Sequence, residues 1–181
     1  MLRYAVFIDG GYLRKVLSVF KEPKISYQKL SDYFSQNDVR LRTYYYDCAP
    51  FQSNPPTEEE KTRKAGFDRF LNNLERNVTR FQSRLGRLQR LQTPKGDKFS
   101  QKMVDVLLTV DLVRLSSERQ IQRAVLIARD SDFVPAIQVA RDSGVVVQLY
   151  HGNNPKPHWQ LLQNCDERYI IDQNMVNSIL L

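Results

Sequence analysis

The feature that most constrains the fold is an apolar run that ends in acidic residues. In the stretch VLIARDSDF, residues 125–133, four apolar residues typical of a buried strand lead into Asp130 and Asp132. A second run of this kind, Tyr4–Ile8, is followed directly by Asp9. Strands without polar alternation are typical of a parallel sheet whose two faces are covered by helices.

The remaining segments alternate between helix and strand patterns, which indicates βαβ units around a mostly parallel sheet. Apolar residues at helical spacing predict helices over residues 12–20, 26–34, 57–77 and 133–143. Further strands are expected at residues 39–47, 78–88, 123–128 and 144–150. The end of the chain predicts a helical turn at 158–163, a short strand at 168–172 and a helix at 173–181. The sequence therefore predicts an α/β fold.

Two segments are harder to assign from their pattern. Residues 78–98 carry arginines at a spacing that would line one helix face, but Gly86 and the Val78–Thr79 start favour a strand to about Leu88. Residues 95–98 are expected to form a loop, and Ser100 is expected to cap a helix that begins at 101.

The composition is that of a globular protein with a basic surface. The 181 residues predict a single domain over 1–181, with a helical and basic embellishment at about 50–100. The net charge of +7 favours polyanionic partners such as RNA. The two cysteines are far apart and show no zinc or disulfide pattern, and no segment resembles a signal peptide or a membrane span, so we expect a cytoplasmic protein.

The acidic residues that follow strands are expected to meet at one edge of the sheet, because ligand sites lie beyond the carboxyl ends of parallel strands. A helix beginning at residue 101 would run back along the sheet and bring its first turns to the same edge. The predicted catalytic and metal-binding residues are therefore Asp9, Asp105, Asp130 and Asp132. Oxygen ligands without histidine or cysteine suit Mg²⁺ or Mn²⁺.

Each of these acids also has an alternative interpretation. A single aspartate after a strand is commonly a helix cap, so Asp130 or Asp132 could cap the helix that follows. Asp111 lies six residues after Asp105, about 9 Å further along the helix axis, and in the centre of its apolar stripe. We expect Asp111 to be hydrogen-bonded in a structural role, or to support the site from behind its ligands.

Cationic and aromatic residues near these acids are candidates for RNA contacts, since arginine and aromatic groups bind backbone and bases. The candidates are Lys102, Arg129, Arg80, Arg84, Arg87 and Tyr12. The alternative for the arginines is an amphipathic surface whose side-chain stems cover apolar neighbours.

Three stretches resemble the NYN domain family, in its LabA-like branch, which belongs to the PIN-like nuclease superfamily. They are VFIDGGYL at 6–13, KMVDVLLTVDLVRL at 102–115, and VLIARDSDFVPAIQVARDSGVVVQLY at 125–150. The resemblance implies a PIN-like three-layer α/β/α sandwich, an acidic pocket for Mg²⁺ or Mn²⁺, and hydrolysis of RNA. The implied site residues are again Asp9, Asp105, Asp130 and Asp132, and Asp111 also matches the family pattern.

We therefore predict a metal-dependent ribonuclease. Two departures from the family pattern, Tyr12 in place of asparagine and Arg129 in place of glycine, motivate an alternative, a weak or inactive RNA-binding or protein-interacting regulator. A different Mg²⁺-dependent phosphotransfer enzyme is a third hypothesis, although Gly10–Gly11 after Asp9 argues against a phosphatase of the Asp-x-Asp type. The apolar residues 175–181 could pack on the domain or on a second copy in a homodimer.

Overall fold

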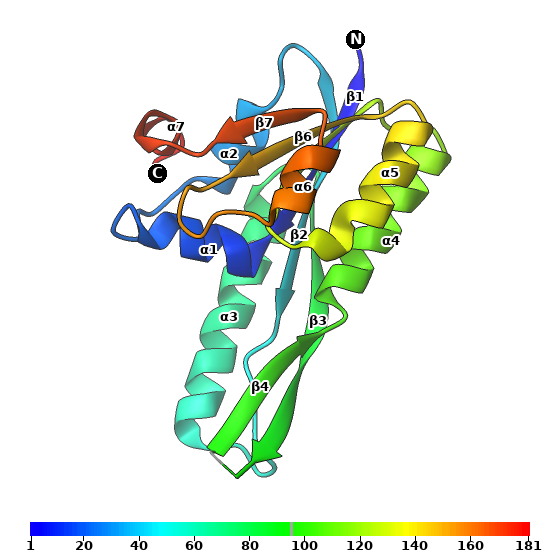
Figure 1. Cartoon of the computed structure of the whole chain (residues 1–181). Coiled ribbons are helices and arrows are strands. Elements are labelled where there is room, and N and C mark those ends of the chain that lie inside the picture. Colours follow the sequence, from blue (N-terminus) through cyan, green and yellow to red (C-terminus); the bar gives the residue numbers. More distant parts are fainter. Residues whose placement is uncertain (95) are drawn as a thin grey trace.

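A seven-stranded sheet forms the middle layer of the fold (Figure 1). The computed structural model describes residues 1–94 and 96–181, apart from the side chains at 89, 91–93 and 98–102. The strands are β1 (Arg3–Asp9), β2 (Val39–Cys48), β3 (Phe81–Thr93), β4 (Gly96–Lys102), β5 (Arg123–Ile127), β6 (Val146–His151) and β7 (Glu167–Ile170). Their order is β4-β3-β2-β1-β5-β6-β7, and all neighbours are parallel except the edge pair β3–β4.

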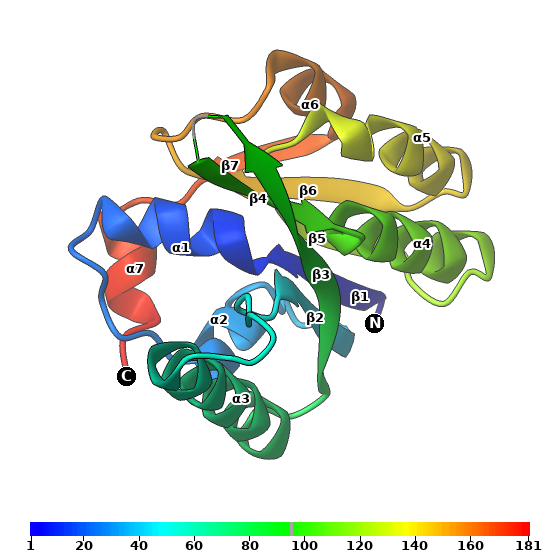
Figure 2. The same ribbon diagram turned by 90° about the horizontal axis from the view of Figure 1, so that it is seen from below.

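Helices cover both faces of this sheet (Figure 2). One face carries α1 (Gly10–Ser18), α2 (Tyr27–Tyr33), α3 (Glu58–Asn77) and α7 (Gln173–Ser178). The other carries α4 (Val104–Ser117), α5 (Val134–Asp142) and α6 (Trp159–Asn164), and a short 3₁₀ helix, η1 (Ser131–Phe133), precedes α5. The predicted α/β/α sandwich with a mostly parallel sheet is confirmed. No helix in the described ranges is long and apolar enough to cross a membrane.

The central strands are buried on both sides because their residues alternate between two apolar cores. In β1, Val6 and Ile8 belong to the core under α1, whereas Ala5 and Phe7 belong to the core under α4 and α5. The C-terminal helix α7 packs Met175 into the first of these cores. Its apolar face is therefore directed at the chain's own sheet, and the homodimer stays a prediction.

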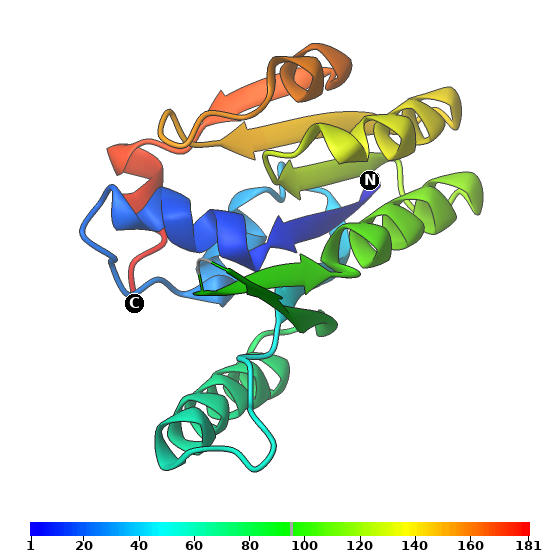
Figure 3. The same cartoon turned by 60° about the horizontal axis from the view of Figure 1, so that its bottom comes forward.

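The sheet has a topological switch point between β1 and β5. From β1 the chain continues outward through β2 and β3, and it later returns to place β5, β6 and β7 on the other side of β1. Figure 3 shows β1, β5, β6 and β7 pointing the same way, and β2 and β3 are parallel to them, so the carboxyl ends of these strands lie along one edge of the sheet. Connections leave the switch point in opposite directions, which opens a crevice where open α/β sheets bind ligands.

The segment between α3 and α4 corrects the prediction made from its sequence. Residue 95 lies outside the described residues, but Gly96–Lys102 form the antiparallel edge strand β4 and not a loop followed by a helix capped at Ser100. Helix α4 begins only at Val104, after Met103 with a φ of 74°. An edge strand held by backbone pairing needs no apolar alternation, so the polar composition of this segment concealed it. Together with α3, the β3–β4 hairpin extends away from the rest of the molecule (Figure 1).

Candidate functional site

A cavity of about 580 Å³ lies at the switch point, beyond the carboxyl ends of β1 and β5. Asp9, Asp105 and Asp130 line it together with Arg14 and Arg129. The structure thus brings three of the four predicted acids to one cavity, from the end of β1, the first turn of α4 and the residues after β5. Asp9 and Asp130 meet because they lie at or just after the carboxyl ends of neighbouring parallel strands, as their positions in the sequence predicted.

Asp9 is half-buried and begins helix α1. Its Oδ1 accepts a hydrogen bond of 2.9 Å from the Tyr12 backbone N–H, so it is also the N-cap of that helix. Burial raises the pKa of Asp9 above its ordinary value; the Tyr12 N–H opposes this, and the charges of Asp105 and Asp47 add to the increase. The carboxylate is therefore held where its negative charge is unfavourable unless a cation is near.

Asp130 and Asp132 lie on the turn that carries the chain from β5 into α5. Asp130 Oδ1 accepts from the Asp132 backbone N–H at 3.1 Å and caps η1, so the capping alternative holds for it as well. Asp132 is exposed and is not part of the cavity wall. It nevertheless acts on the site, since partial desolvation followed by the charges of Asp130 and Asp132 raises the pKa of Asp105.

Asp111 lies deeper in α4, away from the cavity wall, and is 5% exposed. Its Oδ2 accepts from the Tyr46 hydroxyl at 3.0 Å and from Arg84 Nε at 3.2 Å, and its Oδ1 lies 3.5 Å from Arg114. These contacts match the expectation of a hydrogen-bonded acid. They tie α4 to β2 and β3 and so hold the helix that presents Asp105.

Asp47, which the sequence reasoning did not single out, is the acid that completes this edge. It ends β2, is 2% exposed, and accepts from Cys48 N at 2.8 Å, from the Tyr45 hydroxyl at 3.1 Å and from the guanidinium of Arg14. The signal was available, because Asp47 follows the apolar run of its strand as Asp9 does. Its role is to hold Arg14 at the cavity wall.

Tyr12 does not have the base-stacking position that the sequence suggested. It is 2% exposed, its hydroxyl donates to the Pro155 carbonyl at 3.0 Å, and it accepts from Gly152 N at 3.1 Å. Its hydroxyl therefore joins α1 to the loop after β6, and its buried ring offers no open face for base stacking. Tyr12 nevertheless lines the acidic cavity, so a contact with RNA there stays a prediction. Arg129 is exposed at the cavity, where a guanidinium can contact a phosphate.

Among the side chains that the structure describes, the other predicted RNA contacts do not form one surface. Arg84 and Arg87 are three residues apart in a strand, so their side chains leave opposite faces of the sheet. Arg84 is paired with Asp111, and Arg80, at the amino end of β3, donates to the Arg40 carbonyl at 2.5 Å. Arg87 is exposed, and the Lys102 side chain lies outside the described residues. The spacing of these arginines would place them on one face of a helix, but in a strand their side chains point to different sides.

The donor set of the cavity fits a hard divalent cation. Its candidate ligands are carboxylate oxygens. Two of these carboxyl groups, those of Asp9 and Asp105, have raised pKa values, which a bound cation would lower. Within the described ranges, no group of three or more His, Cys, Asp or Glu side chains lies in an arrangement that could by itself hold a metal ion. Mg²⁺ commonly keeps several waters and takes only one or two carboxylates, so an open arrangement of this kind suits it.

Comparison with known proteins assigns the chain to a family. The NYN domain family matches residues 3–174. The chain belongs to the NYN domain family. This is a PIN-like nuclease family, so the resemblance is confirmed at the level of the family, and the LabA-like branch stays a prediction. No curated protein matches the chain.

The fold is similar to that of a solved protein. A protein of unknown function from Vibrio parahaemolyticus superposes with a TM-score of 0.67 at 20% identity, over 99% of this chain and 96% of the other. At that identity the likeness shows the fold alone. MurG from Acinetobacter baumannii gives a TM-score of 0.40 at 11% identity, over 93% of this chain and 45% of that protein.

Proposed function

We propose that this NYN domain is a ribonuclease of the LabA-like branch that hydrolyses RNA phosphodiester bonds with the help of Mg²⁺ or Mn²⁺. The observation that carries the proposal is the meeting of Asp9, Asp105 and Asp130 at the topological switch point, in a chain with a net charge of +7. An acidic pocket inside a basic protein suits a polyanion such as RNA. Basic side chains would hold the RNA backbone, and the scissile phosphate would lie at the metal ion.

The chain's own residues divide the work of the site. Of the three acids that line the cavity, Asp9, Asp105 and Asp130, one or two would bind the cation directly and the rest through water, with Asp132 near enough to add negative charge. A cation there would supply an activated water and neutralise charge on the leaving oxygen. Arg129 would contact a phosphate oxygen at the cavity, and Arg14, on α1, would offer a second cationic contact. Asp47 orients Arg14, and Asp111 orients the helix that carries Asp105.

The test is cleavage of labelled single-stranded, hairpin and duplex RNAs, with DNA controls, in Mn²⁺, Mg²⁺ and EDTA. We expect metal-dependent cleavage of RNA that Asp9→Asn and Asp130→Asn abolish. The matched control is Asp142→Asn, which changes an exposed aspartate on α5 that does not line this cavity. Cleavage that survives both site variants, or that survives EDTA, would contradict the proposal.

A second candidate function is RNA binding without turnover. It is favoured by the lack, among the described residues, of any group of three His, Cys, Asp or Glu side chains that could hold a metal ion. The burial of Tyr12, at the position where the family commonly has asparagine, also favours it. Under this alternative the cavity binds RNA through Arg14 and Arg129 but hydrolyses nothing. Tight RNA binding with no cleavage in Mn²⁺ would support it over the nuclease.

A further inference from the structure

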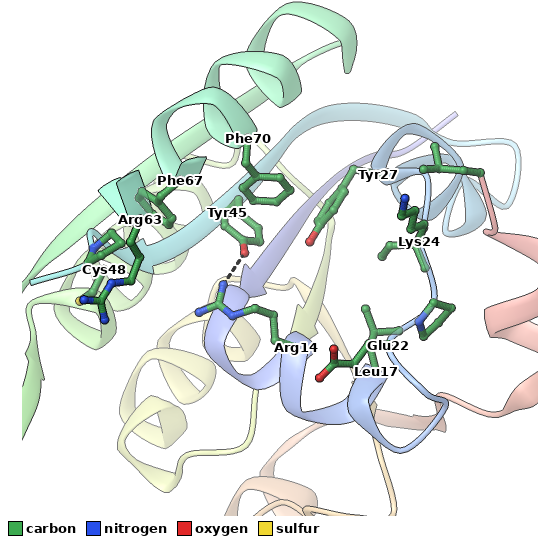
Figure 4. A pocket seen from close by; sticks show the side chains of 14 residues that line it. Arg14, Leu17, Glu22, Lys24, Tyr27, Tyr45, Cys48, Arg63, Phe67 and Phe70 are labelled. Atoms are coloured by element: carbon green, nitrogen blue, oxygen red, sulfur yellow. Dashed lines mark hydrogen bonds between the residues drawn. The ribbon is translucent and has the colours of Figure 1, made fainter. Parts of the chain in front are cut away.

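A second cavity, of about 720 Å³, lies beside the acidic one and has a different lining. Its wall is largely aromatic and apolar, with Tyr27, Tyr45, Phe67 and Phe70 along one side (Figure 4). The volume is within the range of roughly 300–1,000 Å³ typical of sites for small organic groups. The elements around it are α1, the start of α2, α3 and the loop after β2.

The aromatic wall is packed but leaves one ring without an aromatic neighbour. Tyr27 meets Tyr45 edge-on with ring centroids 5.7 Å apart, and Phe70 meets Tyr27 at 5.7 Å and Tyr45 at 6.0 Å. Phe67 is half-buried, lines the cavity, and has no ring partner among the described residues. A planar group entering the cavity could stack on it, as bases stack on aromatic side chains in single-strand binding sites.

The rim of this cavity is cationic. Lys24 and Arg63 are exposed there, and neither forms a close ion pair in the described part of the chain, although the charge of Arg63 helps to lower the pKa of Glu60. Glu22 is the only acid that lines the cavity among those residues. An aromatic wall with a cationic rim is complementary to a nucleotide, whose base is planar and whose phosphate is negative. An apolar peptide would have no use for the unpaired cations.

Arg14 connects this aromatic cavity to the acidic one. Arg14 and Glu22 line both cavities, so the two are adjacent along α1. The Arg14 guanidinium donates to the Tyr45 hydroxyl at 3.0 Å and to both oxygens of Asp47, and its side chain remains 53% exposed. These bonds use three of its five N–H donors, which leaves two for a phosphate between the cavities.

We infer that the aromatic cavity binds one base of a single-stranded RNA next to the scissile phosphate. The inference rests on the proposed RNA function of the acidic site and adds to it a selectivity for single strands. A paired base cannot leave its stack to enter the cavity without an energetic penalty, whereas an unpaired one can. Lys24 and Arg63 contact the backbone on the outer side, and Arg14 contacts it between the base and the acidic site.

The test uses single-stranded RNA that carries one 2-aminopurine, moved along the sequence, and it is run in EDTA so that binding is separate from cleavage. We expect the fluorescence to be quenched at one position, and Phe67→Leu to abolish the quenching. Phe67→Leu keeps apolar bulk in the partly buried site, so the fold is retained. It should weaken single-strand affinity roughly fivefold or more, leave duplex affinity within about twofold, and have no effect on RNA that is abasic at that position.

A charge variant tests the rim independently. Arg63→Ala should weaken binding and reduce the slope of log affinity against log salt by about one. Arg69→Ala is the matched control, since Arg69 is an exposed arginine of the same helix that does not line the cavity. Unchanged binding in both Phe67→Leu and Arg63→Ala would overturn the inference. So would a concentration-dependent dimer that Phe67→Leu disrupts while RNA affinity is kept.

The outcomes also separate this inference from the proposed function. Quenching at one position without cleavage in Mn²⁺ would contradict the nuclease function and support the base-binding cavity. Metal-dependent cleavage without position-specific quenching would contradict the base-binding cavity and support the nuclease function. A wild-type protein that binds no RNA would overturn both.

Discussion

Replacing Asp111 by alanine should destabilise the protein without removing a metal ligand. Asp111 is the acceptor for the hydroxyl of Tyr46, which is fully buried, and leaving that donor unpaired costs about 1–3 kcal/mol. The ion pairs with Arg84 and Arg114 add less than about 1 kcal/mol, since those side chains are 33% and 41% exposed and water can replace the carboxylate. The sum of about 1–4 kcal/mol lowers Tm by roughly 2–16 °C for a chain of this length.

The assay is urea unfolding of wild type, Asp111→Ala, Tyr46→Phe and the double variant, with Mn²⁺ affinity measured on each folded protein. In the Tyr46→Phe background, Asp111→Ala should cost at least about 1 kcal/mol less, because the buried donor is already gone. Asp142→Ala, on an exposed helix surface, should stay within about 0.5 kcal/mol of wild type. The reasoning is refuted if Asp111→Ala unfolds like wild type, or if it loses Mn²⁺ binding while keeping its stability.

Four further predictions concern Asp9, the divalent cation, Gly10 and the start of helix α3. The pKa values of Asp9 and Asp105 are raised in the folded protein, so their neutral forms favour folding below pH about 4, and this stability is lost as the pH rises through the raised values. In EDTA, Asp9→Asn should therefore be more stable than wild type at pH 7 and equal to it at pH 3. Thermal unfolding at the two pH values measures this difference. Cation binding has the opposite sign, and Mn²⁺ affinity measured by calorimetry should fall as pH drops through the same range. Gly10→Ala would place a Cβ 2.4 Å from the Tyr45 ring, and urea unfolding should show a loss of about 1–3 kcal/mol, whereas a change within error would show that the ring moves freely. Thr57→Ala removes the capping box of α3 and should lower stability by about 1 kcal/mol in the same assay, with exposed Thr62→Ala as the comparison.

The parts of the fold that could be predicted are those whose burial produces a recognisable pattern of apolar residues in the sequence. The central residues of β1 and β5 are apolar because both faces of these strands are covered, and the acids at or just after their carboxyl ends reach one edge because the strands are parallel. The capping box at Thr57 and Glu60 likewise fixed the start of α3. These signals are local, and they were enough to bring Asp9 and Asp130 to one cavity.

The parts that could not be predicted depend on contacts between distant segments. β4 carries no apolar alternation, since its strand is held by backbone pairing with β3 at the edge of the sheet. The pairing of Arg84 with Asp111 joins residues 27 apart and removed Arg84 from the predicted RNA surface. The aromatic cavity is assembled from residues between 14 and 181 in the sequence, and no local pattern announces it.

Equilibrium binding of Mn²⁺ tests the central claim, that Asp9, Asp105 and Asp130 share one divalent cation at the switch point. Free Mn²⁺ would be measured by electron paramagnetic resonance during titration of wild type, Asp105→Asn and Asp142→Asn. We predict saturable binding to wild type and Asp142→Asn, and at least about tenfold weaker binding to Asp105→Asn. Equal affinity in all three proteins, or no saturable binding to wild type, would contradict the claim.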